Sequence, residues 1–139
     1  MSDPGPPIRA VVTVLGLDQH EAGALAVAAL LRDAGFEVIY AGRFNLPATV
    51  AAIASDEDAD VVGISCHSWE FLYYAQELAE MLHDLSPPVP VVVGGSVVTA
   101  SDRDEVLAKG IDAAVLASAE RDEIVDAFRR LARQRQGAR

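Results

Sequence analysis

Apolar positions along the chain follow two kinds of spacing. Short runs of Val, Ile and Ala, such as 10–15 and 61–64, are unbroken and β-branched, as in strands buried on both faces. Longer segments between them are rich in Ala and Leu and have the composition and length of helices. Gly35, Gly110 and Pro47 stand where helices typically end or begin. The pattern predicts strands at 9–15, 36–40, 61–64, 89–93 and 113–116, and helices at 23–34, 47–55, 70–85, 102–109 and 121–133.

Strict alternation of strand and helix predicts a doubly wound parallel sheet. The expected fold class is α/β and flavodoxin-like, with five parallel strands in the order 2-1-3-4-5. Residues 1–7, rich in Pro and Gly, are expected to form a flexible N-terminal lead. The basic residues 135–139 are expected to form a solvated C-terminal tail. The loops that follow the strands then meet at one edge of the sheet, which is where such folds bind ligands.

Composition narrows the classes of function. At 139 residues, the chain has the size of one domain and is short for an enzyme with its own substrate cavity. A formal net charge of −10 disfavours nucleic acid and anionic membranes, because both are bound through clustered Lys and Arg. The single cysteine, Cys66, excludes an internal disulfide and a cysteine-based zinc site. Without a signal-peptide pattern or an apolar run of about 20 residues, we expect a soluble, cytoplasmic protein.

The loop after the first strand carries the most specific chemistry, with the spacing Asp18-x-His20-x-x-Gly23. A loop histidine can offer one ring nitrogen to a metal, while a nearby carboxylate accepts a hydrogen bond from the other nitrogen and fixes the tautomer. A glycine lets the backbone turn or lets a bulky group approach. The alternative is an ordinary polar loop, in which Asp18 caps the helix and His20 is solvated.

This loop, with Gln19 at its centre, resembles the signature of cobalamin-binding domains that hold the corrinoid base-off and His-on. In that family a histidine replaces the cofactor's dimethylbenzimidazole as the lower cobalt ligand. The resemblance extends over residues 8–133, implies a Rossmann-like cobalamin-binding domain at 8–134, and is strongest to the small subunits of carbon-skeleton mutases. It implies that His20 is the metal ligand and Asp18 its hydrogen-bond partner.

Three further loops at the same edge match parts of the family pattern. Ser65 matches the serine that holds the displaced base, although His67 stands where the family has leucine, and Gly94 and Gly95 match the glycine pair beside the nucleotide tail. Ser65 could instead cap a helix, the glycines could form an ordinary turn, and His67 could be solvated. The remaining candidate contacts with the cofactor are His67, Trp69, Ser96 and Ala117, of which Trp69 could instead meet a partner subunit.

Two departures from the family pattern affect the expected function. Residues 117–120 read Ala-Ser-Ala-Glu where relatives carry a Gly-Pro-Gly-like turn, which puts the far wall of the tail slot in question. Val14 stands where many acyl-CoA mutase relatives carry lysine, which favours the glutamate mutase branch.

The resemblance implies a cobalamin-binding subunit of an adenosylcobalamin-dependent carbon-skeleton mutase, of the glutamate mutase kind. In such enzymes the cobalt–carbon bond breaks homolytically and the deoxyadenosyl radical takes a hydrogen from the substrate, while the protein binds and tunes the cofactor. A larger barrel-type catalytic subunit is the implied partner, and the isolated subunit is expected to be inactive. The alternatives are a small subunit of an acyl-CoA mutase of the methylmalonyl- or isobutyryl-CoA type, a corrinoid methyl carrier, or a cofactor-free flavodoxin-like regulatory module. The methyl carrier is less consistent with the seven residues before the first strand, because such carriers usually have a helical bundle there.

Overall fold

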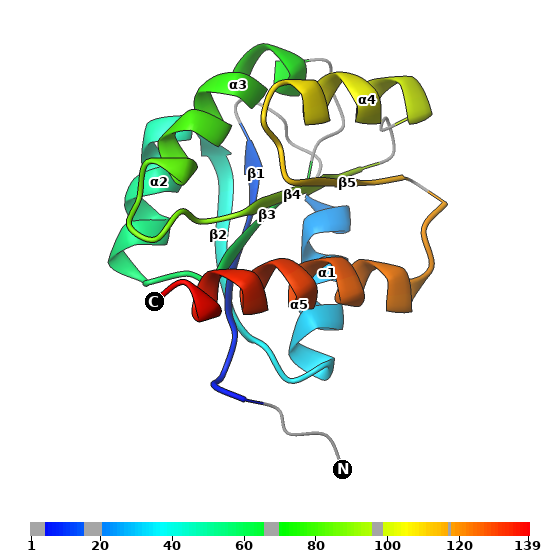
Figure 1. The fold of residues 1–139 in the computed structure, drawn as a ribbon. Coiled ribbons are helices and arrows are strands. Elements are labelled where there is room, and N and C mark those ends of the chain that lie inside the picture. Colours follow the sequence, from blue (N-terminus) through cyan, green and yellow to red (C-terminus); the bar gives the residue numbers. More distant parts are fainter. Residues whose placement is uncertain (1–4, 16–20, 66–69, 96–98, 117) are drawn as a thin grey trace.

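The computed structural model describes residues 5–15, 21–65, 70–95, 99–116 and 118–139. The predicted alternation of strands and helices is confirmed throughout this part of the chain (Figure 1). The elements are β1 (Arg9–Leu15), α1 (Ala22–Asp33), β2 (Glu37–Asn45), α2 (Pro47–Asp56), β3 (Val61–Ser65), α3 (Glu70–His83), β4 (Val91–Gly94), α4 (Ala100–Ala108), β5 (Ala113–Val115) and α5 (Arg121–Gly137).

The five strands form one parallel sheet in the order β2-β1-β3-β4-β5, which confirms the predicted fold class and strand order. The main difference lies in β2, which continues to Asn45 instead of ending at Tyr40. Its pairing with β1 is irregular, because Tyr40 is opposite Val12 while Gly42 is opposite Thr13. One extra residue, Ala41, is therefore inserted in β2 as a β-bulge, and Gly42 has a positive φ of 83°.

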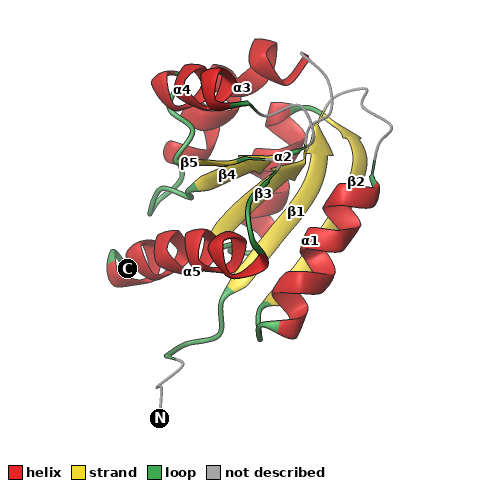
Figure 2. Cartoon of the chain, turned by 90° about the vertical axis from the view of Figure 1, so that its right-hand side faces the viewer, coloured by secondary structure: helices red, strands yellow, loops and turns green. Residues whose placement is uncertain are grey.

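Helices cover both faces of the sheet (Figure 2). Helices α1 and α5 pack on one face through Ala28, Leu31, Phe128 and Leu131. Helices α2, α3 and α4 pack on the other face, where Leu78 and other buried residues form a second apolar cluster. None of the helices in the described part of the chain is long and apolar enough to cross a membrane.

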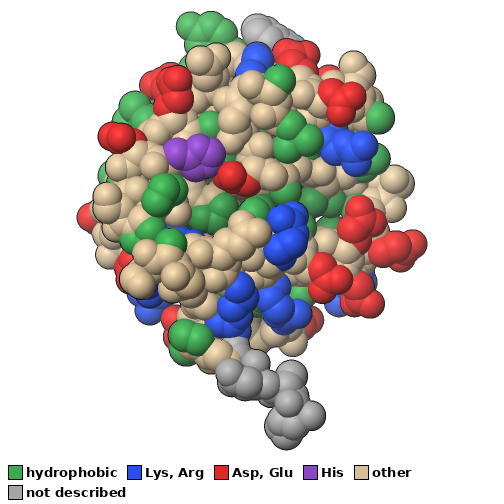
Figure 3. Space-filling view, in the orientation of Figure 1, with side chains coloured by type: hydrophobic (Ala, Val, Ile, Leu, Met, Phe, Trp, Pro, Cys, Tyr) green, Lys and Arg blue, Asp and Glu red, His purple; other side chains and the backbone are tan. Residues whose placement is uncertain are grey.

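The C-terminal end corrects one sequence-based expectation. Residues 135–139 were expected to form a solvated tail, yet α5 continues to Gly137 and the side chain of Arg135 is only 5% exposed. Its guanidinium lies 3.4 Å from a carboxylate oxygen of Asp60, whose side chain is 3% exposed. Several Arg side chains gather over α5 near the start of β1 (Figure 3). The sequence showed only a basic end, because the acid that receives it lies 75 residues earlier.

Asp60 precedes β3 at the amino edge of the sheet and accepts hydrogen bonds from two separate parts of the chain. The donors are the backbone N–H of Arg9 at 3.0 Å, the amide of Gln136 at 3.1 Å, and the guanidinium groups of Arg135 and Arg139 at 3.4 and 2.9 Å. One buried carboxylate thus ties the start of β1 to the end of α5.

Candidate functional site

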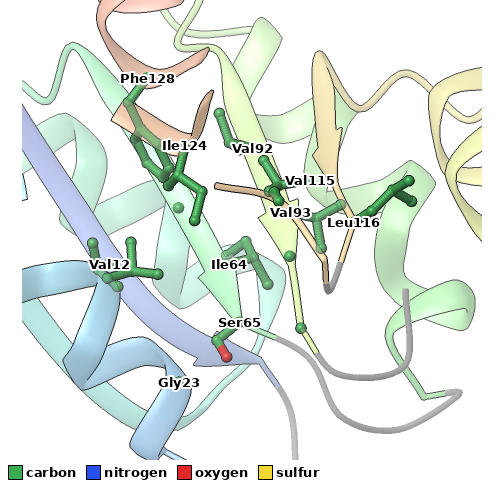
Figure 4. A pocket seen from close by; sticks show the side chains of 15 residues that line it. Val12, Gly23, Ile64, Ser65, Val92, Val93, Val115, Leu116, Ile124 and Phe128 are labelled. Carbon is green, nitrogen blue, oxygen red and sulfur yellow. The ribbon is translucent and has the colours of Figure 1, made fainter. Parts of the chain in front are cut away.

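Four of the residues predicted to form the site are described by the structure, and they lie together. Gly23 begins α1, Ser65 ends β3, and Gly94 and Gly95 lie at the end of β4. All four line one cavity of about 290 Å³ at the carboxyl edge of the sheet (Figure 4). The other predicted site residues lie outside the described part of the chain: Asp18, Gln19, His20, His67, Trp69, Ser96 and Ala117.

The cavity lies between the sheet and helices α1 and α5. Alternation along the strands explains its position: Val61, Gly63 and Ser65 of β3 face these two helices, as do Val92 and Gly94 of β4. Small residues leave room in the cavity, and apolar side chains form its walls. The small lining residues are Gly23, Gly63, Gly94, Gly95 and Ala119, and the apolar walls come from Val12, Val27, Val92, Val115, Ile124 and Phe128.

Gly63 and Phe128 form an inner wall that the sequence analysis missed. A Cβ at Gly63 would come within 2.7 Å of the Phe128 ring, so only glycine lets this ring approach β3 so closely. A glycine inside an apolar strand run is a known sign of close approach, and this signal was present in the sequence. The sequence could not show which side chain contacts Gly63, because Phe128 lies 65 residues further along the chain.

Gly94 has a different role from Gly63. A Cβ there would meet only Val115, with its carbonyl oxygen at 3.5 Å and its Cβ at 3.6 Å, which are ordinary contact distances. The protein itself would therefore tolerate a side chain at this position. Because Gly94 lines the cavity on the same face as Val92, a longer side chain would occupy the cavity. The glycine leaves room for something other than protein.

The chemistry of the lining suits a flat, mostly apolar group. Ser65 supplies the only hydroxyl among the described lining residues, and it is 8% exposed at the end of β3. Leu116, just before the altered turn at 117–120, and Ala119, within it, both line the cavity. The far wall in question is thus built from small and apolar residues in the part of the chain that the structure describes. An aromatic base with one polar contact fits such a slot.

A polar cluster lies beside the loop that carries the Asp-x-His spacing. Glu21, the first described residue after 16–20, accepts a hydrogen bond from the Tyr40 hydroxyl. Its other carboxylate oxygen lies 3.8 Å from Nε of Arg43. Burial, followed by the hydrogen bond to Glu21 and the negative charge of Glu21, raises the pKa of Tyr40 to about 12. The phenol therefore remains a neutral donor at neutral pH.

A family model for the B12 binding domain matches residues 8–129, which is most of the chain. The chain belongs to the B12-binding domain family. This confirms the resemblance to cobalamin-binding domains that the sequence indicated.

Relatives of known name support this assignment. The chain is 38% identical over 120 residues to the pivalyl-CoA mutase small subunit of Xanthobacter autotrophicus, covering 86% of this chain and 80% of that subunit. It is 34% identical over 133 residues to the 2-hydroxyisobutanoyl-CoA mutase small subunit of Aquincola tertiaricarbonis, covering 96% and 97%. It is also 36% identical over 109 residues to ethylmalonyl-CoA mutase of Cereibacter sphaeroides, covering 78% of this chain and 17% of that protein.

Solved structures show the same fold. A cobalamin-binding protein from Desulfitobacterium hafniense superimposes with a TM-score of 0.76 at 20% identity, over 90% of this chain and 59% of that one. The signal receiver domain of the NarL response regulator from Mycobacterium tuberculosis reaches a TM-score of 0.67 at 19% identity, over 91% and 97%. The fold is thus shared by domains of unrelated function, and the cavity and the family must carry the functional argument.

Proposed function

We propose that this chain is the cobalamin-binding small subunit of an adenosylcobalamin-dependent acyl-CoA mutase. The observation that carries the proposal is the match to the 2-hydroxyisobutanoyl-CoA mutase small subunit over nearly the full length of both chains. The three relatives described above are all named as mutases of CoA esters, which favours this alternative over the glutamate mutase expected first from the sequence. These matches outweigh the expectation of a glutamate mutase that was drawn from Val14 in place of lysine.

The described residues fit a cobalamin. In this proposal the dimethylbenzimidazole enters the slot between β3, β4 and α5, which has apolar walls, and Ser65, which lines the slot, would hydrogen-bond it. Gly94 and Gly95 leave room for the nucleotide tail along the end of β4. In this proposal His20 is the lower cobalt ligand and Asp18 fixes its tautomer. When bound, adenosylcobalamin supplies the radical chemistry, and the residues of this chain bind and orient the cofactor.

A larger, barrel-type subunit would hold the CoA ester and complete the enzyme. The small-subunit relatives are named as parts of such enzymes, and ethylmalonyl-CoA mutase contains the matching region as 17% of a much longer chain. We therefore expect the isolated chain to bind cobalamin without turning over any acyl-CoA. Turnover by the purified chain alone would contradict this division of labour.

The proposal is tested by binding cob(II)alamin to the purified protein and recording its EPR spectrum. A histidine nitrogen on cobalt splits each line into three, and 15N labelling of the protein changes the three lines to two. We expect this change in the wild type and its loss in His20→Ala. His67→Ala tests the rival ligand, and His83→Ala is the matched control, because His83 is bound to Asp112 at the opposite edge of the sheet, with 2.7 Å between Nε2 and Oδ2. A wild-type chain that retains no cobalamin contradicts the proposal.

A further inference from the structure

Glu21 begins a helix without capping it. It occupies the N-cap position of α1, and its carbonyl accepts the first helical hydrogen bond from the N–H of Leu25 at 2.9 Å. Its side chain makes no capping hydrogen bond, although this position favours residues whose side chains do. The carboxylate instead reaches sideways to Tyr40 and Arg43 of β2. An N-cap residue whose side chain does not cap departs from the usual preference at this position. This departure suggests that the carboxylate of Glu21 serves to hold the chain in place against β2.

The strand that receives Glu21 is held rigidly next to β1. The Thr13 hydroxyl, fully buried in β1, donates to the carbonyl of Gly42 at 2.8 Å and accepts from the Asn45 amide at 2.8 Å. The Asn45 amide also donates to the carbonyl of Ala41 at 3.0 Å. These bonds lock the β-bulge between Tyr40 and Arg43, and bulges commonly re-aim side chains beside active sites. The two partners of Glu21 are thus fixed on either side of the bulge.

Strand β2 thereby holds both ends of the segment 16–20. At one end, Leu15 of β1 pairs with Asn45. At the other end, Glu21 is fastened to Tyr40 by a hydrogen bond and lies beside Arg43. The described residues on the two sides of 16–20 are therefore both held by β2.

We propose that Tyr40 is a positioning residue for the cobalt ligand, acting through Glu21, which is covalently next to His20. This inference rests on the proposed function, since it requires that His20 ligates cobalt. Arg43 supports the same carboxylate from the other side. Tyr40 contacts neither the metal nor the corrin in this mechanism, and its effect is on where the chain leaves the ligand loop.

The test compares Tyr40→Phe with Tyr73→Phe in the full chain. Both variants lose one phenolic hydroxyl, but Tyr73 lies on α3 and is 75% exposed. With 15N-labelled protein and saturating cob(II)alamin, the readout is the share of bound cobalamin whose EPR lines are split into two by a protein nitrogen. A loss of folded protein would lower the total amount bound without changing this share. We expect Tyr40→Phe to lower the His-on share and to weaken cobalamin binding about tenfold, the size of one lost hydrogen bond to a charged acceptor, while Tyr73→Phe matches the wild type.

A second pair of variants covers the case in which Tyr40→Phe folds poorly. Arg43→Gln removes one support of the carboxylate at a side chain that is 39% exposed, and Arg43→Lys keeps the charge. We expect a smaller fall in the His-on share for Arg43→Gln and partial rescue by Arg43→Lys. A wild type that shows the histidine splitting, with Tyr40→Phe and Arg43→Gln unchanged from it, overturns the positioning role alone. A wild type that binds cobalamin without the splitting, or binds none, overturns the proposed His20 ligation and this inference together.

Discussion

The two edges of the sheet use their polar residues in opposite ways. At the amino edge, Asp60 is buried and accepts hydrogen bonds from Arg9, Gln136, Arg135 and Arg139. At the carboxyl edge, glycines and apolar side chains surround a cavity of about 290 Å³, and Glu21 is turned away from the helix that it begins. One edge is closed by charges that hold distant parts of the chain together, whereas the other leaves space that the protein does not fill.

Because of this difference, we expect substitutions at the two edges to affect different properties: the free energy of unfolding at one edge and the cofactor affinity at the other. Changes at the amino edge should lower the free energy of unfolding and leave the cofactor affinity of the folded protein unchanged. A change at Gly94 in the cavity should do the reverse, because an added side chain there would meet Val115 at ordinary contact distances. A substitution that affects both properties equally would show that the edges are coupled.

The largest effect is expected for Asp60→Ala. It leaves the guanidinium of Arg135, 5% exposed, without the buried carboxylate that it faces. Removing one partner of a buried ion pair typically costs about 3–5 kcal/mol in the free energy of unfolding, which urea denaturation would measure. Asp58→Asn is the control: Asp58 also pairs with Arg135, but it is 67% exposed, and such pairs contribute about 1 kcal/mol or less. Asparagine also tolerates the positive φ of 51° at this position. Equal losses for the two variants would contradict the assigned role of Asp60.

The next effect is expected for Gly94→Leu at the carboxyl edge. Its Cβ would meet Val115 at ordinary contact distances, so the fold should tolerate it, while the rest of the side chain occupies the cavity. We expect cobalamin binding to weaken on the order of a hundredfold, as a hydrophobic pocket does when several methylene groups compete for its space. Gly137→Leu, where an added Cβ would meet nothing within 4 Å, is the matched control at the far end of α5. Unchanged binding by Gly94→Leu in equilibrium dialysis would place the cofactor elsewhere.

A smaller effect is expected at the start of α4. Thr99 forms a capping box with Asp102, in which each side chain accepts a hydrogen bond from the other residue's N–H at 3.2 Å. Thr99→Ala should cost about 1 kcal/mol in the free energy of unfolding, measured by urea denaturation. Thr99→Ser keeps the cap and serves as the control. Because this cap follows a loop of the carboxyl edge, unchanged cobalamin affinity in Thr99→Ala would show that only some residues of that edge serve the site.

The sequence predicted the fold well because its signals are local. Apolar runs marked the strands, and Gly35 and Gly110, with φ of 96° and 105°, ended the helices where expected. Ser65, Gly94 and Gly95 could be singled out because each carried a local signal, and all three line the cavity, while their contact with a cofactor stays a prediction. The contact of Gly63 with Phe128 and the contact of Asp60 with Arg135 join residues far apart in the sequence, and no local pattern specifies such a pairing.

The last prediction concerns Tyr40, the residue in the described part of the carboxyl edge whose pKa is strongly shifted. Burial and Glu21 raise the pKa of Tyr40 to about 12 from an ordinary value of 10.0. Between these two values the unfolded chain has lost the phenolic proton while the folded chain retains it, so the stability from this group is complete below pH 10 and falls as the pH rises toward 12. In Tyr40→Phe this part of the pH dependence should disappear, whereas Tyr73→Phe should retain it. Urea midpoints of the three proteins at about pH 9 and about pH 11 measure the difference, and an equal loss of stability in wild type and Tyr40→Phe would show that Tyr40 is not the group responsible.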